Sequence, residues 1–198
     1  MDKRQFLSSA AVLGAVAAPA FARKPVSNQA CAASPTLLTI AGDIKRHNRG
    51  ALDPALDQLM KKQLVKFDEA YTFDFQSIAS LPSVTIKPTL EYDGHPHTLS
   101  GPLLTDVLAH VGAPEAGDTK VLLRAIDGYV VMLTLDAVRA NRFIVATQLD
   151  GKPMPLGGLG PLWAVYDADR IPELAAKALN ERFVTCPWAV YQIQVIAA

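Results

Sequence analysis

The apolar residues of this chain fall in short runs that turn residues separate, which is the pattern of strands rather than of long helices. Asp127-Gly128 lies between two such runs and is a strong hairpin dipeptide. The pattern predicts strands over 36–40, 83–87, 121–126, 129–133, 143–148, 162–166 and 188–196.

Three other segments carry apolar residues at the spacing of an amphipathic helix. Asp53-Pro54 opens the first with a cap followed by proline, and Gly101-Pro102 starts the second. The three apolar stripes are Leu52, Leu56 and Leu59; Leu103, Leu104, Val107, Leu108 and Val111; and Ile171, Leu174, Ala175, Ala178 and Leu179. Residues 67–81 stay ambiguous, because aromatic residues alternate over 67–75 while 74–81 suits a helical turn.

The order of these elements favours one fold class. Short strands and helices follow one another in no strict β-α-β order, which predicts an α/β (α+β) fold with a mixed β-sheet and packed helices. The chain has 198 residues, about one domain once a leader is set aside. Residues 36–198 are therefore expected to form a single domain, after a flexible segment at 23–35 that is small, polar and interrupted by proline.

The first 22 residues have the layout of an export signal. A basic start at 1–4 precedes an apolar run at 6–18, and Ala20-Phe21-Ala22 is a small-x-small cleavage site. Residues 3–7, Lys-Arg-Gln-Phe-Leu, resemble the twin-arginine signal except that a lysine takes the first arginine's place, so this route and the general secretory route both stay open. We expect a periplasmic protein that is cleaved near Ala22.

Charge and hydropathy exclude two kinds of partner. The chain has 19 Lys and Arg against 19 Asp and Glu, and no block of like charge follows the leader. Binding to nucleic acid or to an anionic membrane surface is therefore not expected. After residue 22, Asp, Lys, Gly or Pro interrupts every apolar run before the roughly twenty residues that a bilayer requires, so the mature chain is expected to have no membrane span.

Cys31 and Cys186 are the two cysteines of the chain. Disulfides form and persist in the oxidising compartments to which export leads. A single bridge and two unpaired thiols both stay open, because spacing alone does not show whether the two Cα atoms come close. No Leu stands three residues before Cys31, and no lipid anchor is predicted.

Short motifs for metal, phosphate or nucleophile chemistry are weak. His95-Pro96-His97 puts two imidazoles on one side of an extended chain, but no further ligands accompany them, which favours a surface loop over a metal site. Gly157, Gly158 and Gly160 lead into a strand rather than into Lys-Ser/Thr and a helix, which favours a tight turn over a phosphate cradle. There is no Gly-x-Ser-x-Gly elbow, and we predict no catalytic residue.

Two tryptophans have two readings each. Trp163 and Trp188 stand at the starts of predicted strands, where their rings either line a cleft or fill the core. Aromatic side chains dominate protein cores, which favours the second reading from the residues alone.

The second half of the chain resembles the molybdopterin-binding domain of the sulfite-oxidase-like oxidoreductases. The segments that carry the resemblance are GPLLTDVL at 101–108, DGYVVMLTL at 127–135, IVATQLDGKPMP at 144–155, GPLW at 160–163 and the terminal strand at 188–196. The resemblance implies an α/β fold around a mixed sheet, with a cleft for a pyranopterin and, in the enzymes, a molybdenum-bound cysteine. Residues 37–43 would be the family's opening strand.

The chain departs from this family where its chemistry is concentrated. The family's metal-binding cysteine falls at the stretch Pro88-Thr89-Leu90-Glu91, which has no thiol to supply a soft ligand. Trp163 and Pro187 stand where the family has basic residues that neutralise the cofactor phosphate. The departures indicate that no cofactor is bound, although the resemblance keeps molybdopterin open.

Two functions of different class follow. In the first, the old cofactor cleft, with Asp127, Tyr129, Trp163 and Trp188 as candidate lining residues, holds a small-molecule ligand or a periplasmic protein partner, and the protein is a ligand-binding or sensory module. In the second, the protein is a molybdopterin-dependent oxidoreductase with an oxygen ligand in place of cysteine. The twin-arginine-like signal favours the second, and the missing cysteine and basic residues favour the first.

Overall fold

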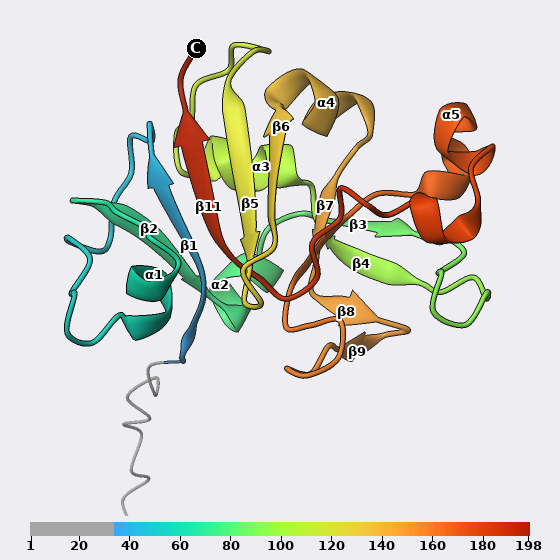
Figure 1. Cartoon of the computed structure of the whole chain (residues 1–198), viewed down its shortest axis with the longest axis horizontal. Helices are drawn as coiled ribbons and strands as arrows, with labels where there is room; N and C mark the ends of the chain where they lie inside the picture. Colours follow the sequence, from blue (N-terminus) through green and yellow to red (C-terminus); the bar gives the residue numbers. More distant parts are fainter. Residues whose placement is uncertain (1–33) are drawn as a thin grey trace, which may run out of the picture. The chain divides into compact units, whose positions relative to one another are not determined.

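One five-stranded sheet is built from distant parts of the chain. The computed structural model describes residues 34–198; the leader, most of the predicted flexible segment and Cys31 lie outside the described residues. The strands are β1 (Thr36–Gly42), β2 (Ala70–Asp74), β5 (Lys120–Ala125), β6 (Val130–Thr134) and β11 (Val190–Ile196). Their order is β2-β1-β11-β5-β6, in which β1 and β11 are parallel and the other pairs antiparallel (Figure 1).

Two smaller sheets stand beside the first. A four-stranded sheet has the order β3-β4-β8-β9, and β10 pairs with β7 in a two-stranded sheet. Their bounds are β3 Ser83–Ile86, β4 Leu99–Pro102, β7 Ile144–Ala146, β8 Gln148–Leu149, β9 Lys152–Pro153 and β10 Trp163–Val165. Together the sheets and helices confirm a mixed α/β fold.

The helices are short. They are α1 (Gln58–Lys62), α2 (Phe75–Ala79), α3 (Leu104–His110), α4 (Leu135–Ala140) and α5 (Pro172–Ala175), with 3₁₀ turns η1 (Ala168–Arg170) and η2 (Leu179–Glu181). The ambiguous segment is a strand followed by a helix, because Asp74 and Ser77 form a reciprocal capping box at the start of α2. Within residues 34–198, no helix is long and apolar enough to cross a membrane.

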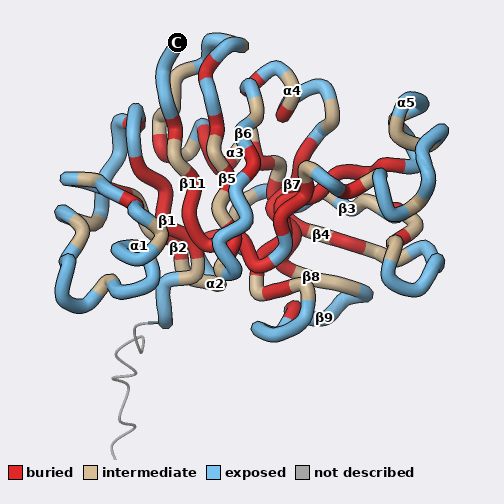
Figure 2. The backbone as a smooth tube through the Cα atoms, in the orientation of Figure 1, coloured by how far each residue is buried: buried red, intermediate tan, exposed pale blue. Residues whose placement is uncertain are grey.

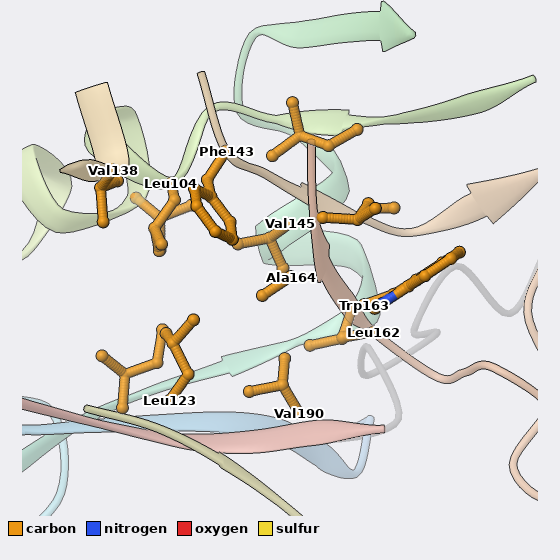
Figure 3. Close-up of a cluster of buried hydrophobic side chains, with 14 of the residues drawn as sticks. Leu104, Leu123, Val138, Phe143, Val145, Leu162, Trp163, Ala164 and Val190 are labelled. Carbon is orange, nitrogen blue, oxygen red and sulfur yellow. The ribbon is translucent and has the colours of Figure 1, made fainter. Parts of the chain in front are cut away.

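The core lies between the five-stranded sheet and the elements packed on it. The buried stretches of β11, β4 and β7 meet in the middle of the domain (Figure 2). On β5, every second residue is buried, as expected for a strand with one face on the core. Figure 3 shows Leu123 and Val190 of the large sheet facing Leu104, Val138 and Phe143 across this core.

Two of the predicted helices begin later than the pattern indicates. Asp53 caps a turn instead, because its Oδ1 accepts hydrogen bonds from the N–H groups of Ala55 and Leu56, and α1 begins only at Gln58. Leu56 is 81% exposed, so the predicted apolar stripe does not face the core. Gly101 belongs to β4, where a Cβ atom would overlap the carbonyl of Val145, and the helix begins after it.

Other predicted elements differ from the observed ones because the observed helices and strands are too short for their apolar residues to show a clear periodicity. The predicted helix over 171–179 is split between α5 and η2, with exposed residues between them. The strand predicted over 143–148 is split between β7 and β8. Helix α4 directly follows β6, and Thr134 caps it by accepting a hydrogen bond from the N–H of Ala137 at 3.2 Å.

Candidate functional site

A pocket lies where the β5–β6 turn, the segment before β11 and the β3–β4 loop meet. Its volume is about 150 Å³. We call it the Trp188 pocket, and its lining residues are Glu91, Tyr92, Ala125, Asp127, Tyr129, Phe183, Val184, Cys186, Pro187 and Trp188. Three of the four candidates predicted from the sequence, Asp127, Tyr129 and Trp188, therefore line one cavity.

The β5–β6 turn presents Asp127 and Tyr129. Gly128 between them has a φ of 92°, a left-handed conformation that glycine adopts without strain. Oδ1 of Asp127 accepts a hydrogen bond from the N–H of Tyr129 at 2.9 Å, which is an Asx turn. The hairpin thereby places a carboxylate and an aromatic ring side by side at the edge of the pocket.

The segment before β11 forms the second wall. The hydroxyl of Tyr129 donates a hydrogen bond to the carbonyl oxygen of Val184 at 2.6 Å, and the N–H of Ile126 donates to the carbonyl of Ala189 at 3.1 Å. These bonds join the turn to the segment that carries Trp188. The side chains of Tyr129 and Trp188 remain 46% and 39% exposed, so both rings are open to a ligand.

The β3–β4 loop supplies Glu91 and Tyr92. The loop is anchored by Leu90, which is 3% exposed, and is closed by a hydrogen bond from the N–H of Leu90 to the carbonyl of His95 at 2.9 Å. Glu91 is partly buried and Tyr92 is 54% exposed. The anchor holds the carboxylate and the ring at the pocket while leaving them solvent-accessible.

Asp169 braces two walls of the pocket. Its Oδ2 accepts a hydrogen bond from the N–H of Thr89 at 2.7 Å, and its Oδ1 pairs with Nη1 of Arg182 at 2.9 Å. Arg182 also donates to the carbonyls of Lys177 and Ala175. One carboxylate therefore ties the loop of Glu91 to the segment that leads to Trp188.

The charged groups of the pocket are acidic. Among the described residues, no Lys, Arg or His lines it. Partial burial, and then the carboxylate of Glu91 beside it, raise the pKa of Tyr92 to about 12, and burial raises the pKa of Cys186 to about 12. The phenol and the thiol are neutral at physiological pH, so the carboxylates of Glu91 and Asp127 set the charge of the pocket.

Trp163 does not line the pocket, contrary to its place among the predicted candidates. It is 0% exposed, and its Nε1–H donates to the carbonyl oxygen of Cys186 at 2.9 Å. The physical reason is that all three residues of β10 are buried, so the strand is covered on both faces and neither face can line a cleft. Figure 3 shows Trp163 beside Leu162 in the buried cluster.

The structure describes only one of the two cysteines, Cys186. Cys186 is 4% exposed, lines the pocket and has no disulfide partner within residues 34–198, while Cys31 lies outside the described residues. The bridge between Cys31 and Cys186 stays a prediction.

The paired histidines lie in the β3–β4 loop. Nδ1 of His97 contacts Oδ2 of Asp150 at 2.7 Å, and Nε2 contacts Oδ2 of Asp93 at 2.8 Å, so both ring nitrogens are occupied by carboxylates. His95 is exposed. Within the described part of the chain, no group of three or more His, Cys, Asp or Glu side chains is arranged to hold a metal ion.

Sequence reasoning missed most of the pocket's second and third walls. Tyr92, Phe183 and Val184 were not candidates, since nothing in their local sequence separates them from ordinary loop residues. Glu91 and Pro187 carried a signal, because the chain departs there from the family that it resembles. Both positions line the same pocket, whereas the third departure, Trp163, lies in the core.

Comparisons with known proteins give a likeness to solved structures. No protein-family model matches the chain, and no curated protein matches it. Among solved structures, the sulfane dehydrogenase SoxCD from Paracoccus pantotrophus is similar, with a TM-score of 0.51 and 13% sequence identity over 80% of this chain and 37% of that one. The chain thus spans well under half of the length of this dehydrogenase. At this identity the likeness concerns the fold alone, and this chain has a mixed α/β fold of the sulfite-oxidase-like kind.

Proposed function

We propose that this protein is an exported ligand-binding or sensory module that uses the Trp188 pocket to hold a small molecule or a segment of a periplasmic partner. The observation that carries the proposal is the lining of the pocket. Three partly exposed aromatic rings and two carboxylates converge on one cavity, with no basic side chain among the described residues that line it. Aromatic walls with a few placed polar groups are typical of small-ligand sites.

The residues of the pocket do not fit molybdopterin. The pyranopterin carries a phosphate, which Glu91 and Asp127 repel and which no Arg or Lys among the described lining residues neutralises. A volume of about 150 Å³ is also small for a large cofactor, since ligand pockets are commonly about 300–1,000 Å³.

One observation favours the alternative of a molybdopterin-dependent oxidoreductase. Glu91 lies in the pocket and belongs to the stretch where the resembled family has its metal-binding cysteine, so its carboxylate is an oxygen donor near that place. This reading requires the cofactor phosphate to be neutralised by groups outside the pocket lining. We therefore rank it second.

Export is part of the proposal and rests on the sequence alone. The basic start, the apolar run at 6–18 and the small-x-small site before Arg23 support a leader that is removed near Ala22. The periplasm is the compartment to which such a leader sends a bacterial protein.

Elemental analysis of the protein purified from its own host tests the proposal. We expect no stoichiometric molybdenum and no pterin fluorescence after denaturation. One molybdenum per chain together with a released pterin fluorophore would overturn the binding-module proposal in favour of the oxidoreductase.

A further inference from the structure

We propose that the ligand of the Trp188 pocket is a small organic cation of the quaternary or methylated ammonium class. This inference rests on the ligand-binding function proposed above and names the chemistry that the same pocket recognises. It follows from the charge, the aromatic lining and the size of the pocket, which are independent features.

The first support is uncompensated negative charge. Glu91 and Asp127 both line the pocket, and among residues 34–198 neither takes part in a salt bridge. One carboxylate oxygen of Asp127 accepts a hydrogen bond from the N–H of Tyr129. Because a carboxylate at a partly desolvated site interacts more strongly with an ion than it does in water, the pair favours a cation and disfavours an anion.

The second support is the aromatic lining. Tyr92, Tyr129 and Trp188 come from three separate segments and are 54%, 46% and 39% exposed. The face of an aromatic ring attracts a cation, most strongly for tryptophan, and aromatic cages are the usual receptors of quaternary ammonium groups. The bond from the Tyr129 hydroxyl to the Val184 carbonyl holds one of these rings in place before any ligand arrives.

Size and the aromatic lining favour a methylated head over a free amine. A cavity of about 150 Å³ matches a compact group, since an engineered cavity of about this volume accommodates benzene. The carboxylates of Glu91 and Asp127 attract any ammonium ion, so the aromatic rings are what favour a methylated one. A methylated ammonium presents its charge through apolar surface, which packs on the faces of Tyr92, Tyr129 and Trp188.

Calorimetric titration with isosteric probes tests this class. The full-length protein is titrated with choline, with its uncharged isostere 3,3-dimethyl-1-butanol and with the anion 3,3-dimethylbutyrate. We expect choline to saturate one site and the uncharged isostere to bind at least about tenfold more weakly, since the two differ in charge and hardly in shape.

Matched variants locate the site. Glu91→Gln and Asp127→Asn keep the side-chain shapes, and Asp127→Asn retains a side-chain oxygen that accepts from the Tyr129 N–H. Each variant should weaken the binding of choline about tenfold. Glu173→Gln removes a carboxylate from the exposed start of α5 and should leave choline binding unchanged. The thermal midpoint of each variant is measured alongside, so that a folding defect is recognised.

The outcomes separate this inference from the function beneath it. Equal or tighter binding of the uncharged or anionic probe, lost in Trp188→Ala, would overturn the cation class and leave a ligand-binding pocket. Failure of all three probes to bind would overturn the inference and count against the pocket as a binding site. Free solutes and lipid headgroups both carry methylated ammonium groups. We expect the protein to bind choline but not to sediment with phosphatidylcholine vesicles, because two carboxylates would repel the headgroup phosphate. Sedimentation with the vesicles would identify the lipid as the ligand instead.

Discussion

The indole Nε1–H of Trp163 donates a hydrogen bond to the main-chain carbonyl oxygen of Cys186 at a distance of 2.9 Å. This bond joins a strand inside the core to the segment that forms one wall of the Trp188 pocket. The ring centroid of Trp163 also lies 6.0 Å from the ring centroid of Phe183, a residue that lines the same pocket. The two tryptophans thus have different positions: Trp163 supports the wall from within, and Trp188 lines the pocket.

Replacing Trp163 tests this division. Trp163→Ala should lower the free energy of unfolding by about 3–5 kcal/mol, because it leaves a large cavity at a fully buried site. Trp163→Phe keeps a ring but leaves the buried carbonyl of Cys186 without its donor, at a cost of about 1–3 kcal/mol. Denaturant unfolding measures both; a Trp163→Ala protein as stable as the wild type would contradict the core assignment.

The contact between β4 and β7 requires glycine at position 101. A Cβ on Gly101 would overlap the carbonyl of Val145, so Gly101→Ala should destabilise the protein by about 1–3 kcal/mol or more, as overpacking does. Gly50→Ala is the matched control, because nothing lies near its added Cβ. Thermal melts of the two variants should differ clearly, and equal midpoints would show that β4 and β7 lie farther apart.

Asp169 should be a positioning residue for the pocket. Asp169→Ala removes the acceptor of the Thr89 N–H and the partner of Arg182, so the two walls lose their common brace. We expect a loss of about 1–2 kcal/mol in stability, since both groups are partly exposed, and weaker binding of choline. Asp118→Asn, at an exposed turn, is the control. Unchanged affinity in a less stable Asp169→Ala protein would limit the role of this residue to folding.

The loop of Glu91 should become less stable as pH rises. The hydrogen bonds that His97 donates to Asp150, and then to Asp93, raise the pKa of His97. The N–H of His95, and then His97, donate to Asp93 and lower its pKa, and His97, and then the N–H of Thr98, donate to Asp150 and lower its pKa. The histidine contribution is complete below its ordinary pKa of about 6.5 and is lost as pH rises through the raised value. The carboxylate contributions are present above about pH 4 and are lost as pH falls through the lowered values.

The His97 bonds therefore stabilise most between about pH 4 and 6.5. The difference in thermal midpoint between the wild type and His97→Gln should shrink from pH 6 toward pH 9. His95→Gln, at an exposed position of the same loop, should show little difference at any pH. A His97→Gln difference that grows with pH would contradict the protonated arrangement.

Local signals predicted the elements that local chemistry determines. The Asp127-Gly128 hairpin and the strand at β1 follow from a dipeptide and an apolar run, and both are present. The segment 67–81 stayed ambiguous from the sequence, and the structure has a strand and then a capped helix there. The helix expected to start at Asp53 starts only at Gln58, because a single turn satisfies the capping chemistry of Asp53 when no buried face extends it.

Part of the pocket lining could be predicted from the family resemblance, but the meeting of its three segments could not be predicted from local sequence. Glu91, Asp127 and Trp188 are far apart in the chain and meet only when the β3–β4 loop, the β5–β6 turn and the segment before β11 pack together. The burial of Trp163 likewise depends on pairing with Ala146, not on its neighbours in sequence. Resemblance to a family marked the region but did not separate the ring that lines the pocket, Trp188, from the ring that lies in the core, Trp163.

Native mass spectrometry of the protein purified from its own host tests the central claim most directly, because it weighs whatever the Trp188 pocket retains. We predict a small organic cation, one per chain, that Glu91→Gln and Asp127→Asn fail to retain while Glu173→Gln keeps it. An adduct with the mass of a molybdenum-bearing pterin would contradict this claim and identify the protein as a molybdopterin-dependent oxidoreductase instead.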